Sequence, residues 1–213
     1  MTSLALLMFT GLVVYVNGQT KYCCTPQQWE STNSIDSVKV DTQGTKKPVY
    51  TTGVEAVSVD QTGHRIASLS TLTTGGFKVN VQVIQLFDKG VMYTIQSGEC
   101  TPTKIPAWQP NCIPDNATKT LSTYYGAGDN KINVDMYIVK SGPNNVTVVM
   151  SSADCTPMYV SAYGSLNGVS GLSDKVYKNI TLGIKDVSVF TVPDICPNVT
   201  MHHDYVMPTG GWY

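Results

Sequence analysis

Apolar and polar residues alternate along much of this chain, and this alternation is what most limits the folds it can adopt. Between residues 77 and 83 every odd-numbered residue is apolar and every even-numbered one is polar. A period of two places successive side chains on opposite faces of an extended strand. The 26 Val and 25 Thr among 213 residues also favour strands over helices. After Val83 the pattern changes phase, which indicates either a bulge or burial of both faces.

Short turns separate the alternating segments. Turn-forming residues at 60–63, 88–90 and 141–144 join consecutive extended runs, so the chain is expected to form hairpins. Parallel neighbours would need crossovers of a dozen or more residues, so about nine or ten antiparallel strands are predicted. Such a sheet must curl or stack to bury one face. The fold expected from this pattern is therefore all-β, either an antiparallel β-sandwich or a partly closed barrel, called a half-barrel below.

Two segments are less regular. Residues 97–117 contain four prolines, which remove ladder donors, and the segment is predicted to be a loop anchored by Cys100 and Cys112. Residues 164–171 resemble a flexible linker. Residues 176–192 are predicted to form one or two strands, although a short helix is an alternative over 169–178.

The first eighteen residues differ from the rest of the chain. They carry no charge, are apolar from Leu4 to Val16 and end in Val16-Asn17-Gly18, as a secretory signal peptide does. The apolar run is too short for the roughly 20 residues that span a bilayer. We expect a signal peptide over 1–18, a single β domain over 19–213, and no membrane-spanning segment.

Cysteines and glycosylation motifs point to the same compartment. Six cysteines follow the expected cleavage point, which suggests three disulfides in an oxidising environment, and fifteen pairings are open. The sequence contains no C-x-x-C pair of the kind that would indicate a zinc site. Four N-x-[ST] acceptors, which require an exposed asparagine, begin at Asn116, Asn145, Asn179 and Asn198. The sequence therefore predicts a secreted, disulfide-bonded glycoprotein.

Charge and motifs exclude several function classes. A formal net charge of −1 and a single arginine, Arg65, argue against nucleic-acid binding. No nucleophile elbow, zinc-protease or phosphate-loop motif occurs. His64 is expected to be an exposed turn residue, and His202-His203-Asp204 a solvated tail whose adjacent rings point apart. We expect no enzymatic activity.

The aspartate and glutamate side chains are candidate ligands for calcium. The twelve Asp and three Glu are concentrated in turns, where they hydrogen-bond the backbone. Clustered carboxylate oxygens also bind Ca²⁺, and the Asp60 turn and residues 129–131 are candidates, although no EF-hand spacing is present. The only cofactor expected is thus calcium, and no ligand set is assigned.

Alternation also suggests a binding surface. Seven apolar residues are expected to line one face of the curved sheet, where they could fill a core or wall an apolar cavity. These residues are Phe77, Val79, Val81, Tyr93, Ile95, Met136 and Ile138. The pattern does not distinguish the two outcomes, because the volume of the hollow decides between them.

An ordered set of motifs resembles the ependymin and ependymin-related family. The set runs from Cys24-Thr25-Pro26-Gln27-Gln28-Trp29-Glu30 through 57–60, 93–95 with Glu99-Cys100, 113–118 and 153–157 to Leu182-Gly183-Ile184-Lys185-Asp186-Val187-Ser188-Val189-Phe190 and Cys196. The resemblance implies a secreted or lysosomal glycoprotein with a curved, two-layered antiparallel β fold like that of bacterial lipoprotein carriers. It also implies a homodimer, an apolar pocket for lipid-like ligands, and calcium association.

The resemblance also implies disulfides. It matches Cys24 with Cys155 and Cys100 with Cys196, while the family's third pair has no evident counterpart here. We hypothesise that Cys23 bonds Cys112. The expected function is a non-enzymatic, secreted protein that binds a hydrophobic ligand. The alternative is a calcium-dependent extracellular matrix or cell-adhesion component without a carried ligand.

Overall fold

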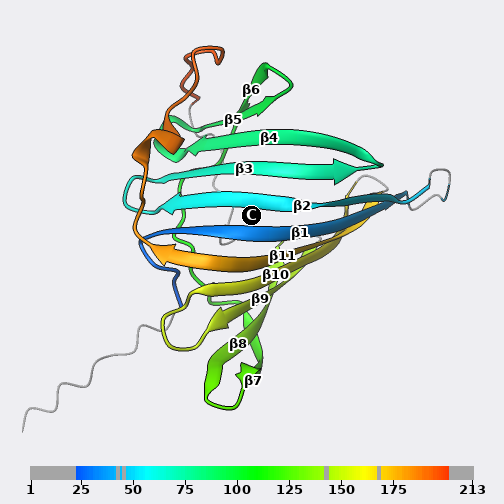
Figure 1. The fold of residues 1–213 in the computed structure, drawn as a ribbon, viewed down its shortest axis with the longest axis vertical. Helices are drawn as coiled ribbons and strands as arrows, with labels where there is room; N and C mark the ends of the chain where they lie inside the picture. Colours follow the sequence, from blue (N-terminus) through cyan, green and yellow to red (C-terminus); the bar gives the residue numbers. More distant parts are fainter. Residues whose placement is uncertain (1–22, 42–43, 45–46, 142–143, 167–168, 202–213) are drawn as a thin grey trace, which may run out of the picture.

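Eleven antiparallel strands form one curved sheet (Figure 1). The computed structural model describes residues 23–41, 44, 47–141, 144–166 and 169–201. The strands are β1 (Gln28–Asp41), β2 (Val49–Asp60), β3 (Arg65–Thr74), β4 (Phe77–Leu86), β5 (Val91–Gln96), β6 (Glu99–Lys104), β7 (Thr118–Ala127), β8 (Asn130–Ser141), β9 (Asn144–Ser151), β10 (Pro157–Leu166) and β11 (Val169–Leu182). Two short 3₁₀ helices are η1 (Phe87–Lys89) and η2 (Val187–Phe190). Within these ranges there is no long apolar helix of the kind that crosses a bilayer.

The sheet consists of two meanders joined at its centre. The strand order is β6-β5-β4-β3-β2-β1-β11-β10-β9-β8-β7, so β1 pairs with β11 although they lie at opposite ends of the chain. The consecutive strands β6 and β7 lie at the two outer edges, and residues 105–117 connect them (Figure 1). The all-β antiparallel prediction is confirmed. The architecture is one open, curved sheet, which corresponds to the half-barrel alternative.

The register of β4 explains its change of phase. Strands β3 and β4 pair without a shift from Arg65↔Leu86 to Thr74↔Phe77, so no bulge interrupts them. Val83 lines a cavity on one face, while Ile84 is fully buried on the other. Burial of both faces is therefore the correct explanation.

Several irregular segments were predicted wrongly. Residues 99–104 form β6, so the proline-containing segment is only partly loop. Residues 164–166 and 169–171 of the expected linker, and the whole of the alternative helix at 169–178, belong to β10 and β11, which pair with each other. The last expected strand is replaced by η2 at residues 187–190. Pairing with a neighbouring strand overrides weak local preference in the first two cases.

One face of the sheet, here called the inner face, carries Trp29, Val59 and Val148 and borders the hollow. The connection 105–117 packs against this face near β8 and β9, where Ile113 contacts buried Val139, Val146, Val148 and Met150. The backbone N–H of Ile113 donates to the carbonyl of Cys23, and that of Thr25 to the carbonyl of Asn111. The segment before β1 and the connection therefore close one part of the hollow together.

The opposite, outer face has its own core at the β3 to β5 end. Ile84, Val91 and Tyr93 are buried there beneath residues 192–201, part of the segment drawn in orange to red in Figure 1. The phenol of Tyr93 donates to the carbonyl of Val199 at 3.3 Å, and Met201 N donates to the carbonyl of Lys89 at 2.8 Å. This C-terminal segment removes apolar side chains of the outer face from water.

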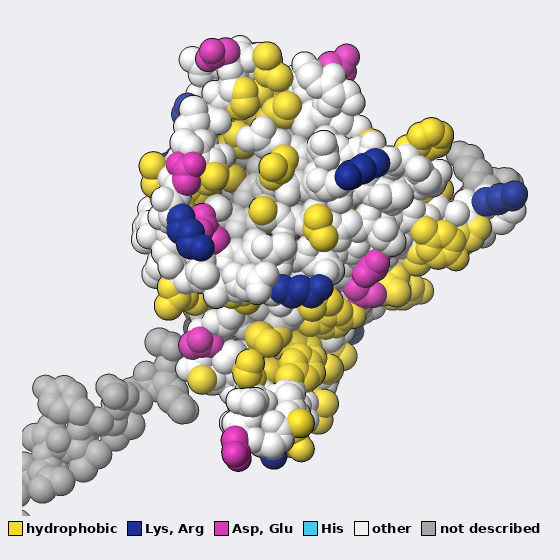
Figure 2. All heavy atoms as spheres, viewed as in Figure 1, with side chains coloured by type: hydrophobic (Ala, Val, Ile, Leu, Met, Phe, Trp, Pro, Cys, Tyr) yellow, Lys and Arg dark blue, Asp and Glu magenta, His cyan; other side chains and the backbone are white. Residues whose placement is uncertain are grey.

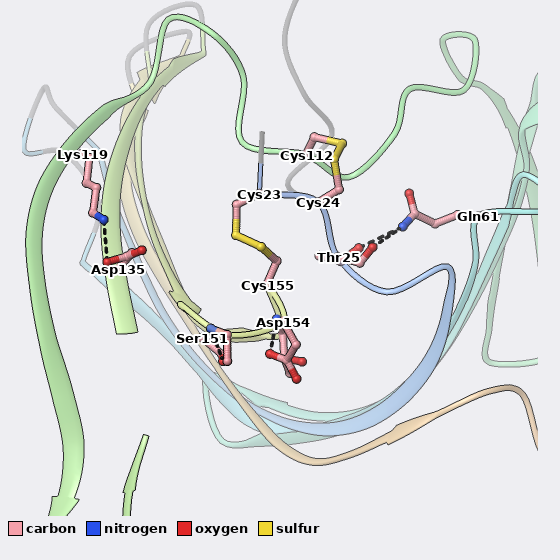
Figure 3. The surroundings of a disulfide bond; sticks show 12 residues. Cys23, Cys24, Thr25, Gln61, Cys112, Lys119, Asp135, Ser151, Asp154 and Cys155 are labelled. Atoms are coloured by element: carbon pink, nitrogen blue, oxygen red, sulfur yellow. Dashed lines mark hydrogen bonds and ion pairs between the residues drawn. A yellow bond between two sulfur atoms is a disulfide. The ribbon is translucent and has the colours of Figure 1, made fainter. Parts of the chain in front are cut away.

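All six cysteines form disulfides, with two pairings that differ from expectation. The bonds are Cys23–Cys155, Cys24–Cys112 and Cys100–Cys196, so the Cys100 pairing is confirmed and the Cys24–Cys155 and Cys23–Cys112 pairings are wrong. Cys24 forms an antiparallel bridge with Cys112. Adjacent side chains on extended backbone point apart, so Cys23 is left to reach Cys155 after β9. Figure 3 shows the Cys23–Cys155 and Cys24–Cys112 bonds inside the hollow.

Candidate functional site

The seven predicted ligand-binding residues do not share one face. Phe77, Val79 and Val81 lie on the inner face. Val81 pairs with Ser70 and Ser70 pairs with Glu55, which lies on the same face of β2 as Val59. On the outer face lie Tyr93, Ile95, Met136 and Ile138. The prediction of a common face is therefore wrong.

Cross-strand register is the reason for the split. Strand β5 follows η1 and Gly90, whose φ of 64° favours glycine and allows the tight turn. This turn pairs Leu86 with Val91, so Tyr93 faces outward beside Ile84. Alternation along a single strand says nothing about which face its neighbour's apolar residues occupy.

The environments of these residues also differ. Phe77 at the β3–β4 hairpin is 78% exposed, whereas Tyr93 is 1% exposed in the outer core. Val79, Val81, Ile95 and Met136 are half-buried, and Ile138 is 38% exposed. None of the seven is among the residues that line the inner-face cavity described next.

A cavity of about 300 Å³ lies on the inner face at the centre of the sheet. Its lining comes from β1 to β5, β10, β11 and the segments around residues 25 and 111. Apolar lining residues include Trp29, Val57, Val59, Ile66, Val83, Met92 and Tyr177. The centre of the hollow is thus not filled by the protein's own side chains.

Two aromatic residues form part of the wall. Trp29 of β1 and Tyr177 of β11 pack edge to face, with ring centroids 5.9 Å apart. Burial, together with the negative charge of Glu55, raises the pKa of Tyr177 well above its ordinary value. The phenol is therefore neutral at physiological pH and adds no charge to the cavity.

The cavity also contains one buried ion pair. Nζ of Lys175 on β11 lies 2.9 Å from Oε2 of Glu55 on β2, and the two side chains are 21% and 10% exposed. Asn33 of β1 donates from Nδ2 to the same Glu55 oxygen at 2.9 Å, and its Oδ1 accepts from Ser31 at 2.8 Å. These four residues make a polar patch that contains both charged side chains of the cavity, whose other polar lining residues, Thr25, Ser68, Gln85 and Asn111, are uncharged.

One rim of the cavity is held by Gln61. Its Nε2 donates to the carbonyls of Thr25 and Pro26 at 2.8 and 2.9 Å, and its Oε1 accepts from the backbone N–H of Asn111 at 3.1 Å. Thr25 and Asn111 both line the cavity. Buried amide hydrogen bonds of this kind fix the two covering segments against each other, and Figure 3 shows the bonds between Gln61 and Thr25.

Sequence reasoning missed the residues of this site. Trp29, Asn33, Lys175 and Tyr177 belong to strands that were not predicted with the correct extent, and Glu55 precedes the recognised 57–60 run. A polar stripe on an inner face gives no apolar alternation. The signal that could have found it is a charged residue of each sign within Thr- and Val-rich extended chain.

The Asp60 turn, one of the two calcium candidates, contains an extensively hydrogen-bonded carboxylate. Its carboxylate accepts from Gln28, Thr62, Gly63 and Arg65 at 2.6 to 3.0 Å. Burial acts to raise the pKa of Asp60, but hydrogen bonds from Thr62, Gln28 and Arg65 outweigh it and hold that pKa far below its ordinary value. Within the described ranges no cluster of His, Cys, Asp and Glu could hold a metal ion. Calcium association stays a prediction.

The side chain of His64 contacts Asp88 and Trp108. Its Nδ1 lies 2.8 Å from Oδ1 of Asp88, and its ring stacks on Trp108. The expected tail at His202-His203-Asp204 and the signal peptide over 1–18 lie outside the described residues. The four asparagines of the sequons, Asn116, Asn145, Asn179 and Asn198, are all exposed, and their glycosylation stays a prediction.

Comparison with known proteins agrees with the motif resemblance. The family model described as Ependymin matches residues 77–196, more than half of the chain. This chain belongs to the ependymin family. Development-specific protein LVN1.2 of Lytechinus variegatus is 31% identical over 147 residues, which cover 61% of this chain and 78% of that protein. Ependymin-related protein 1 of Haliotis asinina is 26% identical over 204 residues, which cover 90% and 97%.

Solved structures share only a loose likeness with this ependymin-family chain. An uncharacterized conserved protein from Thermus thermophilus has a TM-score of 0.49 at 6% identity, covering 79% of this chain and 86% of that one. A LolA superfamily protein from Nitrosomonas europaea has a TM-score of 0.36 at 10% identity, covering 80% and 93%.

Proposed function

We propose that this ependymin-family protein is a secreted, non-enzymatic binding protein that holds a hydrophobic, lipid-like ligand in the inner-face cavity. The observation that carries the proposal is the cavity of about 300 Å³ between the sheet and the segments that cover it. This volume is at the lower end of the roughly 300–1,000 Å³ typical of small-molecule sites. Three disulfides support an extracellular or other oxidising compartment.

The lining favours an apolar chain over a polar solute. Trp29 and Val59 are each 3% exposed, and Val57, Ile66, Val83 and Met92 continue the apolar surface. An alkyl chain that left water for this surface would gain about 0.8 kcal/mol for each buried CH₂ group. Burial of several such groups supplies the driving force for binding once the cost of association is met.

A matched pair of variants on β2 tests the proposal. Val57 lines the cavity, whereas Val54 on the same strand faces outward and is 53% exposed. Val57→Trp should fill the cavity and abolish uptake of a fluorescent fatty-acyl probe, while Val54→Trp should leave uptake unchanged. Native mass spectrometry of secreted protein should also reveal co-purified lipid. Wild-type protein that is always empty and takes up no probe would disprove the carrier function.

The alternative function, a matrix or adhesion component, is favoured by a separate observation. Large apolar residues of β2, β10 and β11 remain exposed on the outer face, and Figure 2 shows apolar side chains gathered over β11 and β10. They include Tyr50, Val54, Tyr163, Leu172 and Val176. A face of this kind suits association with a second copy of the chain, as the homodimer expectation requires. Sedimentation with and without calcium tests both the dimer and the proposed calcium dependence: a monomer in both conditions would oppose this alternative.

A further inference from the structure

The ion pair in the cavity has unused hydrogen-bonding capacity. Among the described residues, Nζ of Lys175 has one acceptor, Oε2 of Glu55, although an ammonium carries three donors. Oε2 of Glu55 is occupied by Lys175 and Asn33, whereas no described residue donates to Oε1. Both side chains line the cavity, so its polar patch can donate to and accept from a ligand.

The charge of the patch is already balanced. Glu55 and Lys175 contribute one charge of each sign, and no further charged side chain lines the cavity among the described residues. A ligand carboxylate would be attracted to Lys175 but repelled by Glu55, and it would also lose its hydration. A quaternary ammonium would meet the reverse conflict. An uncharged group that both donates and accepts meets neither conflict.

We propose that the cavity selects an uncharged, hydrogen-bonding headgroup, a hydroxyl or primary amide, on an apolar chain. The headgroup lies against Lys175 and Glu55, and the chain extends along Trp29, Val59 and Val83. Fatty alcohols, fatty amides and monoacylglycerols have this chemistry. This inference rests on the proposed carrier function and names the ligand class for the same cavity.

A headgroup series with one alkyl chain tests the inference. Displacement of a bound fluorescent probe is measured for 1-dodecanol, dodecanamide, dodecanoate and dodecyltrimethylammonium at neutral pH, below their aggregation concentrations. The alcohol and the amide are expected to bind at least about tenfold more tightly than either ion, a difference of about 1.4 kcal/mol. Equal affinity for all four, or tighter binding of either ion, would overturn the inference while leaving the carrier function intact. No binding of any of the four would overturn both.

Variants then assign the preference to the ion pair. Glu55→Gln leaves the Lys175 charge unpaired, so dodecanoate should gain affinity relative to dodecanol. Because breaking a buried pair can destabilise the fold, the double variant Glu55→Leu/Lys175→Met removes both charges and their hydrogen-bonding groups together. The double variant should still bind the apolar chain, but its affinity for dodecanamide relative to dodecanol should fall, because the buried amide then has no partner in the ion pair. The control is Lys178→Met, an exposed lysine on the same strand, and an unchanged headgroup preference in the double variant would refute the assignment.

Discussion

Lys175 and Glu55 form an ion pair of 2.9 Å although they belong to β11 and β2, which are separated in the sheet by β1. The pair thus crosses the strand that joins the two meanders, and Asn33 of that strand donates to the same carboxylate oxygen. Residues from both ends of the chain and from its first hairpin meet here. The polar patch of the cavity therefore forms only when β11 returns to pair with β1.

Asn33→Ala should destabilise the protein by about 1 to 3 kcal/mol, because Asn33 is 1% exposed and its loss removes a buried hydrogen-bond partner from both Ser31 and Glu55. The free energy of unfolding in urea measures the change. The matched control is Asn80→Ala, since Asn80 is exposed and accepts from Thr71 at 2.9 Å. Equal effects of the two substitutions would contradict the role assigned to Asn33.

Asp60→Asn should lower stability at neutral pH by roughly 1.5 to 3 kcal/mol, the range for hydrogen bonds to a charged group. The folded-state pKa of Asp60 lies below its unfolded value of about 3.9. Its stabilisation is therefore complete above that value and is lost as pH falls toward the folded-state pKa. Unfolding free energies between neutral pH and about pH 2 should fall less steeply for Asp60→Asn than for wild type. Parallel pH profiles would show that Asp60 does not contribute in this way.

Cys112→Ser should release a thiol on Cys24 and not on Cys23, because Cys24 bonds Cys112. Alkylation at acidic pH, which suppresses thiol exchange, followed by peptide fragmentation between the two adjacent cysteines locates the label. Cys155→Ser is the reciprocal experiment and should expose Cys23. Labels on the opposite cysteines would restore the two expected pairings, Cys24–Cys155 from the family resemblance and the hypothesised Cys23–Cys112.

Removing the Cys100–Cys196 bond by the double variant Cys100→Ala/Cys196→Ala should cost roughly 3 to 5 kcal/mol, given a sequence separation of 96 residues. The C-terminal segment then loses its covalent attachment over Ile84, Val91 and Tyr93. Urea unfolding measures the loss, and increased binding of an apolar dye should report the uncovered outer face. A change below about 1 kcal/mol, with no added dye binding, would mean that packing alone holds the segment.

Local pattern was sufficient for much of the sheet. Alternation at 77–83 and turn residues at 60–63 correctly predicted β4 and the β2–β3 hairpin. The local pattern was insufficient where a strand has no apolar stripe. Strand β1 carries Ser31 and Asn33 on its inner face, and β7 is exposed along its whole length. Such strands are held by their neighbours, and a neighbour across the sheet is not visible in the local sequence.

The sequence by itself determined that the chain is an all-β, disulfide-bonded member of its family, because strand period, turn chemistry and ordered motifs are local properties. Tertiary structure alone decided which faces the apolar residues occupy, which of two adjacent cysteines meets which partner, and that a cavity with one ion pair stays open. These outcomes depend on cross-strand register and on the path of residues 105–117 from one edge of the sheet to the other. A one-residue change in register exchanges every inward and outward side chain, so no pattern within a single strand could have supplied the answer.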